Sequence, residues 1–580
     1  MSRKFFVFLF LLISFALFLT TPKILLFYDG PEYLQIISNQ TFLVSIGMGH
    51  PPIHPVFIGF VWIGTHFLSR LGVSLEYAAN LTVYFSGLSS IFLFYKLARL
   101  LLKEKISYLA TILFSFFPAV WIINTNLMVE SFTLTLFLLT AVLFTRAFIA
   151  PSKLNMVFYC LAAFLLVGAH IQGIFWLLSL FALPFLFPDK TGSDKPAFGR
   201  LFWASIVGIC FSIAFYAGIF YFSGREAISS LRQMFFGKAL AEFYVFENII
   251  RALLLSLRNL GLSVMRGFGA FTPFLFLYIV ARERKNKLFL LGILIFGISL
   301  FISGTVWTGD FMIRRVVFAG VIFALVIANY FQRKSALAII YLLPILLSNS
   351  LLYLKTRTDI PLALMKKAEA TLPTGGVLIQ THYLAPFTYN YDGDKFWVGG
   401  DDLAKVDYFL ENKRVFIDSQ AVFAPYLLYV GNNLHITSLG KFGKSESEDL
   451  FVNYTVDLVG VQNAGKRIYF YELTNTNLTY EERIRLNKES VSGEANLIIG
   501  KAKKGTPVFV YSRKISGRLR RERVDYGDMA LWMWAFLTGR KEPMVWTYAD
   551  KQGVFVMPVS SKEVKDIYVT GEQVEAFQIL

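Results

Sequence analysis

The chain has 580 residues, of which 55% are hydrophobic and 17% aromatic, while only 16% are charged. This composition excludes a single water-soluble domain and indicates a protein that crosses the membrane many times. The formal net charge of +17 would also suit a nucleic-acid-binding protein, but the sequence contains no nucleic-acid-binding motif, and membrane proteins concentrate Lys and Arg in cytoplasmic loops.

Apolar runs long enough to cross a bilayer recur along the first 354 residues. The first run follows Arg3 and Lys4 and lacks a small-x-small cleavage site, so we expect an uncleaved first span. About eleven spans are predicted, at residues 5–22, 77–98, 106–123, 126–148, 154–170, 172–188, 201–223, 268–282, 288–305, 314–331 and 335–354. A shorter run at residues 56–68 is predicted to form a helix lying in the outer membrane interface.

Positive charge predicts the sidedness of these spans. If residues 56–68 do not cross, five short basic segments fall on the side of the N-terminus, as the positive-inside bias requires. They contain Arg99/Lys103/Lys105, Arg146/Lys153, Lys190/Lys195/Arg200, Arg282/Arg284/Lys285/Lys287 and Arg333/Lys334. The N-terminus is therefore predicted to be cytoplasmic, and the first outer loop, residues 23–76, to be extracytoplasmic. Residues 1–354 would form a transmembrane domain.

Residues 355–580 are predicted to form a soluble, extracytoplasmic α/β domain. Helix-like segments at 361–372 and 401–413 alternate with strand-like segments at 375–381 and 414–418. Further strands are predicted at residues 467–473, 495–500, 507–512 and 553–559, with one more helix at about 528–537. The two cysteines, Cys160 and Cys210, lie in apolar runs of the first domain, which excludes a disulfide framework.

The first outer loop carries an unusual group of polar residues. Asp29 and Glu32 are three positions apart and would share one face of a helix, which Pro31 allows to begin there. One carboxylate could act as general base on a hydroxyl and the other could orient it; a solvated helix cap is the alternative. His50, followed by Pro51 and Pro52, would be held at a rigid corner, either as a substrate contact or as a structural histidine.

Further polar side chains fall at the outer ends of predicted spans. Glu130 opens the span at 126–148, where it would bind substrate or favour the helix N-terminus, and His170 and Gln172 lie at the outward turn between two spans. Arg266, Arg314 and Arg315 stand at the outer entrances to later spans, where their planar forks suit phosphate oxygens. Arg251 and Arg258 are better explained by attraction to lipid headgroups.

The sequence resembles the GT-C superfamily of integral membrane glycosyltransferases. It is similar to a family with a His-Pro-Pro motif, long without an assigned function, whose eukaryotic members include protein O-mannosyltransferases. The similarity rests on Asp29-Gly-Pro-Glu32, on His50-Pro51-Pro52, and on Asn80 with the serines that follow it. It covers about the first 180 residues. The family usually continues with Gly-Tyr-Pro, whereas this chain has Ile53-His54-Pro55.

The resemblance implies a membrane glycosyltransferase that moves mannose or a similar monosaccharide from a polyprenyl-phosphate carrier to an extracytoplasmic protein, lipid or glycan. It implies that Asp29 is the catalytic base, that the anomeric carbon is inverted, and that Glu130 and His170 lie near donor or acceptor. Arg266, Arg314 and Arg315 would stabilise the departing phosphate. We expect no nucleotide-binding fold. A divalent metal is left open, because the sequence shows no closed ligand set.

Two alternatives have different sequence signatures. A polytopic transporter or flippase of a lipid-linked or glycan substrate would also carry charges at membrane depth, but two related halves are expected for many such proteins. A membrane-anchored scaffold would need far fewer spans. The absence of cysteines outside the membrane and of a eukaryotic retention signal favours a bacterial or archaeal plasma membrane.

Overall fold

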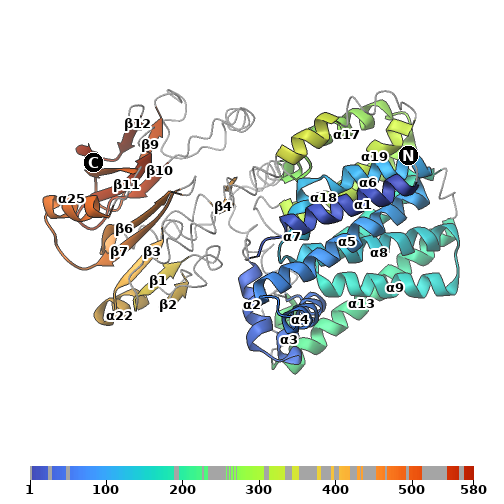
Figure 1. The fold of residues 1–580 in the computed structure, drawn as a ribbon, viewed down its shortest axis with the longest axis horizontal. Helices are drawn as coiled ribbons and strands as arrows, with labels where there is room; N and C mark the ends of the chain where they lie inside the picture. The colour runs from blue at the N-terminus through green and yellow to red at the C-terminus, as the bar shows by residue number, and fades with distance from the viewer. Residues whose placement is uncertain are drawn as a thin grey trace. The chain divides into compact units, whose positions relative to one another are not determined.

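The computed structural model divides into two compact units, residues Met1–Thr358 and Asp359–Leu580. The first is helical and the second combines strands with a few helices (Figure 1). The structure describes residues 3–23, 29–47, 53–188, 195–224, 227–232, 271–305, 313–332, 343–351, 375–380, 393–397, 404–418, 428–430, 433–435, 452–463, 467–490, 495–512, 545–560 and 567–580, with some positions between 257 and 269.

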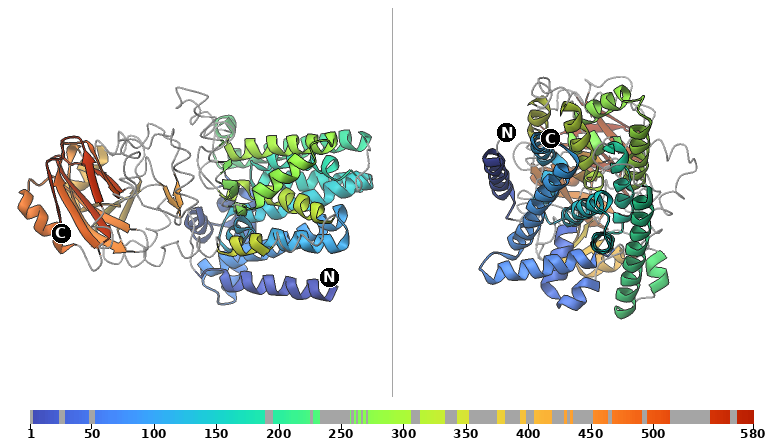
Figure 2. Two further views of the ribbon diagram at one scale, coloured as in Figure 1. Left: turned by 90° about the horizontal axis from the view of Figure 1, so that it is seen from above. Right: turned by 90° about the vertical axis from the view of Figure 1, so that its right-hand side faces the viewer.

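The longer helices of the first unit run roughly side by side (Figure 2). In chain order they are α1 (Arg3–Thr20), α2 (Asp29–Asn39), α3 (Phe42–Gly47), α4 (Pro55–Arg70), α5 (Leu75–Leu101), α6 (Glu104–Ser115), α7 (Pro118–Thr125), α8 (Val129–Ile149), α9 (Lys153–Ala169), α10 (Gly173–Leu180), α11 (Leu183–Leu186), α13 (Lys195–Phe222), α14 (Ala227–Arg232), α17 (Phe271–Arg282), α18 (Lys287–Thr305), the 3-10 helix η2 (Ile313–Val316) and α19 (Ala319–Gln332). Helices α2, α3 and α4 gather at the end of this unit opposite the N-terminus (Figure 1).

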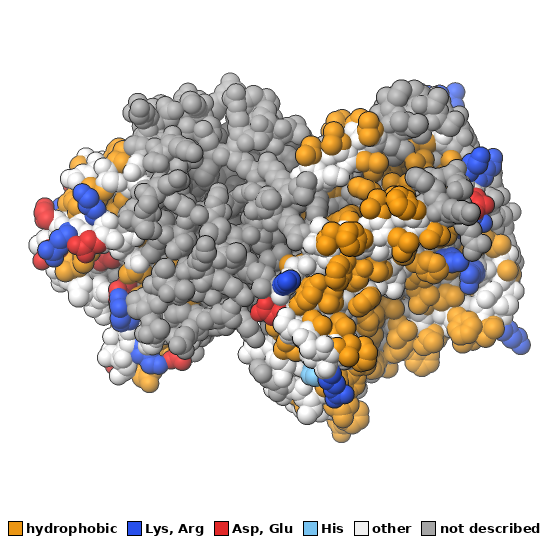
Figure 3. Space-filling model, viewed as in Figure 1, with side chains coloured by type: hydrophobic (Ala, Val, Ile, Leu, Met, Phe, Trp, Pro, Cys, Tyr) orange, Lys and Arg blue, Asp and Glu red, His pale blue; other side chains and the backbone are white. Residues whose placement is uncertain are grey.

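Many of these helices have the composition of membrane spans. Among the described residues, three are long and apolar enough to cross a bilayer, within α5, α8 and α13, and six others are apolar but shorter. Large apolar side chains remain exposed on them, as on Phe202, Trp203 and Phe211 of α13, and such side chains cover much of the visible face of the unit (Figure 3). So much exposed apolar surface suits contact with lipid. The full count of eleven spans stays a prediction.

Two of the predicted spans are interrupted. The run at 106–123 consists of α6 and α7, whose axes are bent by 66°. Pro118 is among the first residues of α7, and proline both lacks an N–H and disfavours helical geometry in the residue before it. The run at 172–188 is likewise divided into α10 and α11, with Pro184 in the first turn of α11. Proline therefore explains breaks that an average of hydropathy does not reveal.

A buried polar seam joins α5, α7 and α8. Asn124 of α7 donates to the Ser90 hydroxyl at 3.3 Å and accepts from the Ser131 hydroxyl at 2.8 Å. Gly87 lies against Asn124, since a Cβ on Gly87 would come within 2.5 Å of the asparagine Cβ. A small residue thus allows the close helix approach that interhelical hydrogen bonds need. This packing holds the start of α8 in place.

The second unit contains one mixed sheet and two antiparallel sheets. The five-stranded sheet has the order β2-β1-β3-β7-β6, and the other two have the orders β10-β9-β12 and β11-β8-β13; β4 and β5 form a separate pair. The strands are β1 (Val377–Gln380), β2 (Asp394–Trp397), β3 (Val415–Asp418), β4 (Leu428–Val430), β5 (Asn433–His435), β6 (Thr455–Asn463), β7 (Arg467–Thr474), β8 (Ala495–Lys501), β9 (Pro507–Ser512), β10 (Val545–Tyr548), β11 (Val554–Ser560), β12 (Ile567–Gly571) and β13 (Ala576–Ile579).

The secondary structure predicted for this unit is largely confirmed where it is described. The six predicted strands are present as β1, β3, β7, β8, β9 and β11, and the helix predicted at 401–413 is α22 (Ala404–Asn412). The helices predicted at 361–372 and 528–537 lie outside the described residues. The structure adds α25 (Tyr480–Glu489), whose capping box joins Thr479 and Glu482. Solubility and extracytoplasmic location stay predictions.

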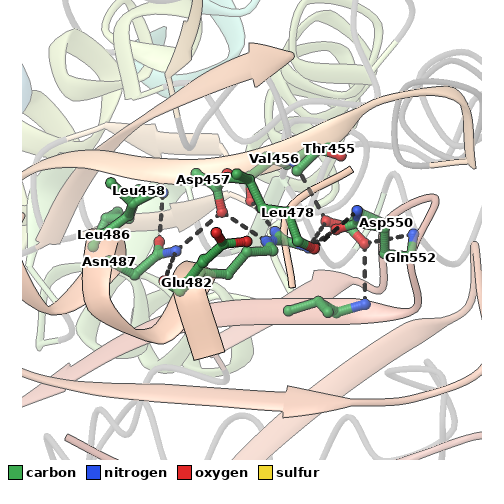
Figure 4. A network of polar contacts seen from close by, with 12 residues as sticks. Thr455, Val456, Asp457, Leu458, Leu478, Glu482, Leu486, Asn487, Asp550 and Gln552 are labelled. Carbon is green, nitrogen blue, oxygen red and sulfur yellow. Dashed lines mark hydrogen bonds and ion pairs between the residues drawn. The ribbon is translucent and has the colours of Figure 1, made fainter. Parts of the chain in front are cut away.

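A buried charge network links three elements of the second unit (Figure 4). Arg483 of α25 is fully buried, and its Nε lies 2.8 Å from Asp457 Oδ1 of β6. One of its terminal nitrogens lies 2.6 Å from Asp550 Oδ2, in the turn after β10. Asn487 also donates to Asp457, at 3.0 Å. Two carboxylates are thus neutralised mainly by one guanidinium, which fastens the mixed sheet to the antiparallel sheets.

Candidate functional site

The helix predicted around the first two carboxylates is confirmed. Helix α2 begins at Asp29 and contains Glu32, and Pro31 lies in its first turn, where its missing N–H has no helical partner to lose. Asp29 and Glu32 therefore share the first turn, although their side chains lie outside the described structure. Tyr33, one turn after Asp29, is buried against Phe57 of α4, with ring centroids 5.2 Å apart. The first turn of α2 is thereby anchored on α4.

The second histidine of the motif region forms the entrance to α4. His54 precedes Pro55, the first residue of α4, and proline at this position starts a helix with no loss of a hydrogen bond. His54 is buried, and its ring meets the edge of Tyr33 at 6.1 Å. His50 lies outside the described residues. His54 therefore lies in the packed interior next to α2.

His54 connects this loop to the junction between α9 and α10. The rings of His54 and His170 are stacked, with centroids 4.7 Å apart and planes 26° apart. His170 follows the last residue of α9, and its Nδ1 accepts a hydrogen bond from the Gln172 backbone N–H at 3.1 Å. Both His170 and Gln172 are buried. The structure therefore brings His170 and Gln172 together with His54.

A second polar group lies at the start of α8. The Glu130 carboxylate is in the first turn of α8, and its Oε1 lies 3.4 Å from Nε of Arg314, in η2. The Glu130 side chain is 4% exposed and that of Arg314 is 14% exposed. Because a buried charge is costly without a counter-ion, each residue explains the presence of the other. Glu130 also lies in the first turn of α8, where a carboxylate suits the positive end of the helix dipole.

The other predicted phosphate ligands are only partly described. Arg315 follows Arg314 in η2, but its side chain lies outside the description, and Arg266 lies outside it altogether. Among the described residues, no three His, Cys, Asp or Glu side chains gather as metal ligands. The side chains of Asp29, Glu32 and His50 lie outside that part of the structure.

An apolar cluster packs the starts of α2, α4 and α8 together. It contains Tyr33, Leu34, Ile36, Ile37, Phe57, Ile58, Val61, Ala79, Val83, Leu127 and Val129. Leu127 and Val129 flank the start of α8, directly before Glu130. The two polar groups, one around His170 and one around Glu130, are therefore attached to the same packed framework as the first turn of α2.

Asn80 positions the start of α8 from α5. This fully buried side chain donates to the Pro22 carbonyl at 3.0 Å and accepts from the Leu127 N–H at 2.8 Å. We expect Asn80→Ala to lower the free energy of unfolding by about 2–4 kcal/mol, because each buried group left without a partner costs about 1–3 kcal/mol. Thermal unfolding in detergent would measure this loss. Ser89→Ala on the exposed side of α5 is the control, and equal stability of the two variants would contradict the assigned role.

Sequence reasoning missed the contributions of His54 and Tyr33. In the sequence, His54 stands out only because Ile53-His54-Pro55 replaces the Gly-Tyr-Pro of the similar family. Tyr33 stands out only as the neighbour of Glu32. The available signal was spacing, since Tyr33 follows Asp29 by four positions and so lies on the same helix face. The stacking of His54 on His170 could not be identified from the sequence, because the two histidines lie far apart in the chain.

No protein-family model matches the chain, and no curated relative matches it. Solved structures do match. The apo structure of ArnT from Cupriavidus metallidurans is 12% identical with a TM-score of 0.48, and the match covers 76% of this chain and 99% of ArnT. The same enzyme bound to undecaprenyl phosphate is 13% identical with a TM-score of 0.46, covering 75% and 98%.

The archaeal oligosaccharyltransferase AglB from Archaeoglobus fulgidus, in complex with an inhibitory peptide and a dolichol-phosphate, is 11% identical with a TM-score of 0.44. This match covers 99% of the present chain and 96% of AglB. At these TM-scores and identities, the likenesses do not decide what this chain does.

Proposed function

We propose that the chain is a membrane glycosyltransferase of the GT-C kind, which transfers mannose or a similar monosaccharide from a polyprenyl-phosphate carrier to an extracytoplasmic acceptor. The observation that carries the proposal is the buried Glu130–Arg314 pair, packed on the framework that holds the first turn of α2. A guanidinium kept at membrane depth suits a phosphate that remains attached to lipid. The motifs Asp29-Gly-Pro-Glu32 and His50-Pro51-Pro52 supply the resemblance.

The proposed reaction is a single displacement. Asp29 accepts the proton of an acceptor hydroxyl, Glu32 orients that hydroxyl, and the oxygen attacks the anomeric carbon from the face opposite the phosphate. The bond from the anomeric carbon to the phosphate oxygen breaks, and its electron pair leaves with polyprenyl phosphate. The configuration is therefore inverted. His50, His170 and Gln172 contact the substrates, and Arg266, Arg314 and Arg315 stabilise the charge on the departing phosphate.

The position of Glu130 indicates a more specific role for this residue in the proposed reaction. We infer that it acts on the phosphate side of the site, because its described ion-pair partner is Arg314. A guanidinium carries five N–H donors in a planar fork, which is more than one carboxylate oxygen can use. Glu130 thus holds the fork in place, and the arginine remains suited to bind a phosphate as well.

Substituting Arg314 tests this arrangement. We expect Arg314→Gln to lower kcat/KM for the lipid-linked donor by about 10–100-fold, the effect of losing one charge-assisted hydrogen bond of about 1.5–3 kcal/mol. The measurement is the initial rate of polyprenyl phosphate release as a function of donor concentration.

Arg314→Gln also leaves the buried Glu130 carboxylate without its counter-ion, so reduced stability could imitate reduced binding. The double variant Arg314→Gln/Glu130→Gln removes that charge and should recover the stability without recovering donor use. If the double variant used the donor as well as the unmodified chain, Arg314 would not bind the phosphate.

A transporter or flippase of a lipid-linked or glycan substrate is the alternative, and one observation favours it. The bent pair α6–α7 is a broken apolar segment, a feature of many transporters. Transport without transfer would move the substrate across a vesicle membrane and leave the sugar attached to its phosphate. Reconstituted vesicles that accumulate intact substrate with no release of polyprenyl phosphate would establish that alternative.

A further inference from the structure

The junction between α9 and α10 carries two buried polar side chains, His170 and Gln172, and the backbone of the junction uses only that of His170. The chain leaves helical geometry between α9 and α10, at His170 to Gln172. Two backbone N–H groups at this break are nevertheless paired. The His170 N–H donates to Leu166 at 3.2 Å, and the Gly173 N–H donates to the His170 carbonyl at 2.8 Å. The Gln172 side chain makes no capping hydrogen bond to α10. The side chain of Gln172 is therefore not explained by capping of α10.

Contacts on both sides fix the His170 ring. Its Nδ1 accepts from the Gln172 backbone N–H at 3.1 Å, so the neutral ring carries its proton on Nε2. One face of the ring is stacked on His54, which is itself held by the edge of Tyr33. The orientation of the His170 ring is consequently fixed.

Gln172 supplies a complementary acceptor. It is 2% exposed, and its Oε1 accepts no hydrogen bond from any residue that the structure describes. A buried acceptor without a partner costs about 1–3 kcal/mol, so such an atom calls for a ligand group or a bound water. A hydroxyl both donates and accepts. It can donate to the amide oxygen of Gln172 and accept from a ring N–H such as that of His170.

We propose that Gln172 and His170, with His54 as the positioning residue, form a subsite that selects one hydroxyl of the transferred sugar. This inference rests on the proposed function. The sugar of the donor is the better candidate than the acceptor, because the subsite is buried among helices of the membrane unit and the donor reaches it from the bilayer. Contacts through His54 and Tyr33 connect the subsite to the helix that Asp29 begins.

The experiment compares the intact donor with analogues that each lack one sugar hydroxyl. For the unmodified chain, one analogue should lose about 10–100-fold in kcat/KM, because it leaves the buried acceptor unpaired. Gln172→Met keeps the length of the side chain and removes its polar atoms. In this variant the preference for the intact donor over that analogue should fall to within about threefold, since no buried amide remains to be satisfied.

Two further variants separate recognition from folding. Gln35→Met makes the same exchange at an exposed position of α2 and should retain the full preference. His54→Phe keeps a ring for stacking and removes the nitrogens, so it should preserve the preference, whereas His54→Ala should reduce it. Thermal unfolding of each variant would show that it is folded.

The outcomes distinguish this subsite from the general function. If the unmodified chain releases polyprenyl phosphate and the Gln172→Met variant discriminates among the analogues as strongly as the unmodified chain, the subsite is refuted. Gln172 then serves only to bind a water molecule or to support the fold. If no donor releases polyprenyl phosphate, the proposed function fails first. Loss of the preference in Gln172→Met alone would establish the subsite.

Discussion

Asp29→Asn is expected to reduce sugar transfer by about 10²–10⁴-fold, the contribution typical of a positioned general base. Asparagine has nearly the same shape as aspartate but cannot accept the hydroxyl proton. Because Asp29 is the first residue of α2 and asparagine also suits the start of a helix, the fold should be retained. The measurement is the rate of transfer to acceptor, together with thermal unfolding of the purified variant.

Two matched variants control for charge. Glu32→Gln removes the neighbouring carboxylate and should cost less than Asp29→Asn, since Glu32 orients the hydroxyl and does not take its proton. Glu76→Gln removes an acidic residue from the first turn of α5 and should leave transfer unchanged. A fully active Asp29→Asn variant would refute the assignment of the base.

Arg483→Met is expected to destabilise the second unit by about 3–5 kcal/mol, because it leaves two buried carboxylates without their counter-ion. Methionine fills much of the same volume, so loss of charge pairing should dominate. Arg483 contacts both Asp457 and Asp550. Chemical unfolding of the full chain in detergent, followed by protease sensitivity of the second unit, would measure the change.

The compensated variant Arg483→Met/Asp457→Asn/Asp550→Asn removes all three charges and should regain much of the loss. Lys503→Met is the control, since it removes one partner of the exposed pair with Glu572 and should change stability by at most about 1 kcal/mol. If Arg483→Met were as stable as Lys503→Met, the network would not hold the sheets together.

The same network gives stability a pH dependence. Burial raises the pKa of Asp550 above its ordinary value of 3.8, and Arg483 offsets only part of that shift. Protonated Asp550 therefore contributes stability that is fully present below 3.8 and is lost as the pH rises through the raised pKa. Asp550→Asn should abolish this slope, which unfolding measurements at several pH values would detect.

Helices and strands could be predicted from the sequence more accurately than the positions at which a helix is interrupted. The alternating strands of the second unit and the start of α4 at Pro55 followed from local patterns, because side-chain periodicity and proline act on neighbouring residues. The bend after α6 was missed although Pro118 indicates it. Helix α25 was missed too, although Thr479 and Glu482 have capping-box spacing.

The candidate site depends on contacts that local patterns do not contain. Glu130 and Arg314 were both selected for their charge and depth, but their pairing joins α8 to a 3-10 helix far along the chain. His54 was set aside in favour of His50, since nothing nearby shows that it would stack on His170. Charge and position in the sequence thus indicated candidate residues, and tertiary packing decided which of them meet.

The proposed reaction cleaves a sugar from a polyprenyl-phosphate carrier. The chain can be overproduced in cells, and membranes from those cells can be supplied with a panel of polyprenyl-phosphate sugars labelled in the sugar. We predict that one donor releases free polyprenyl phosphate and labels an extracytoplasmic product, and that Asp29→Asn abolishes both signals. If the folded chain released no polyprenyl phosphate above the Asp29→Asn background from any donor, the account would be contradicted.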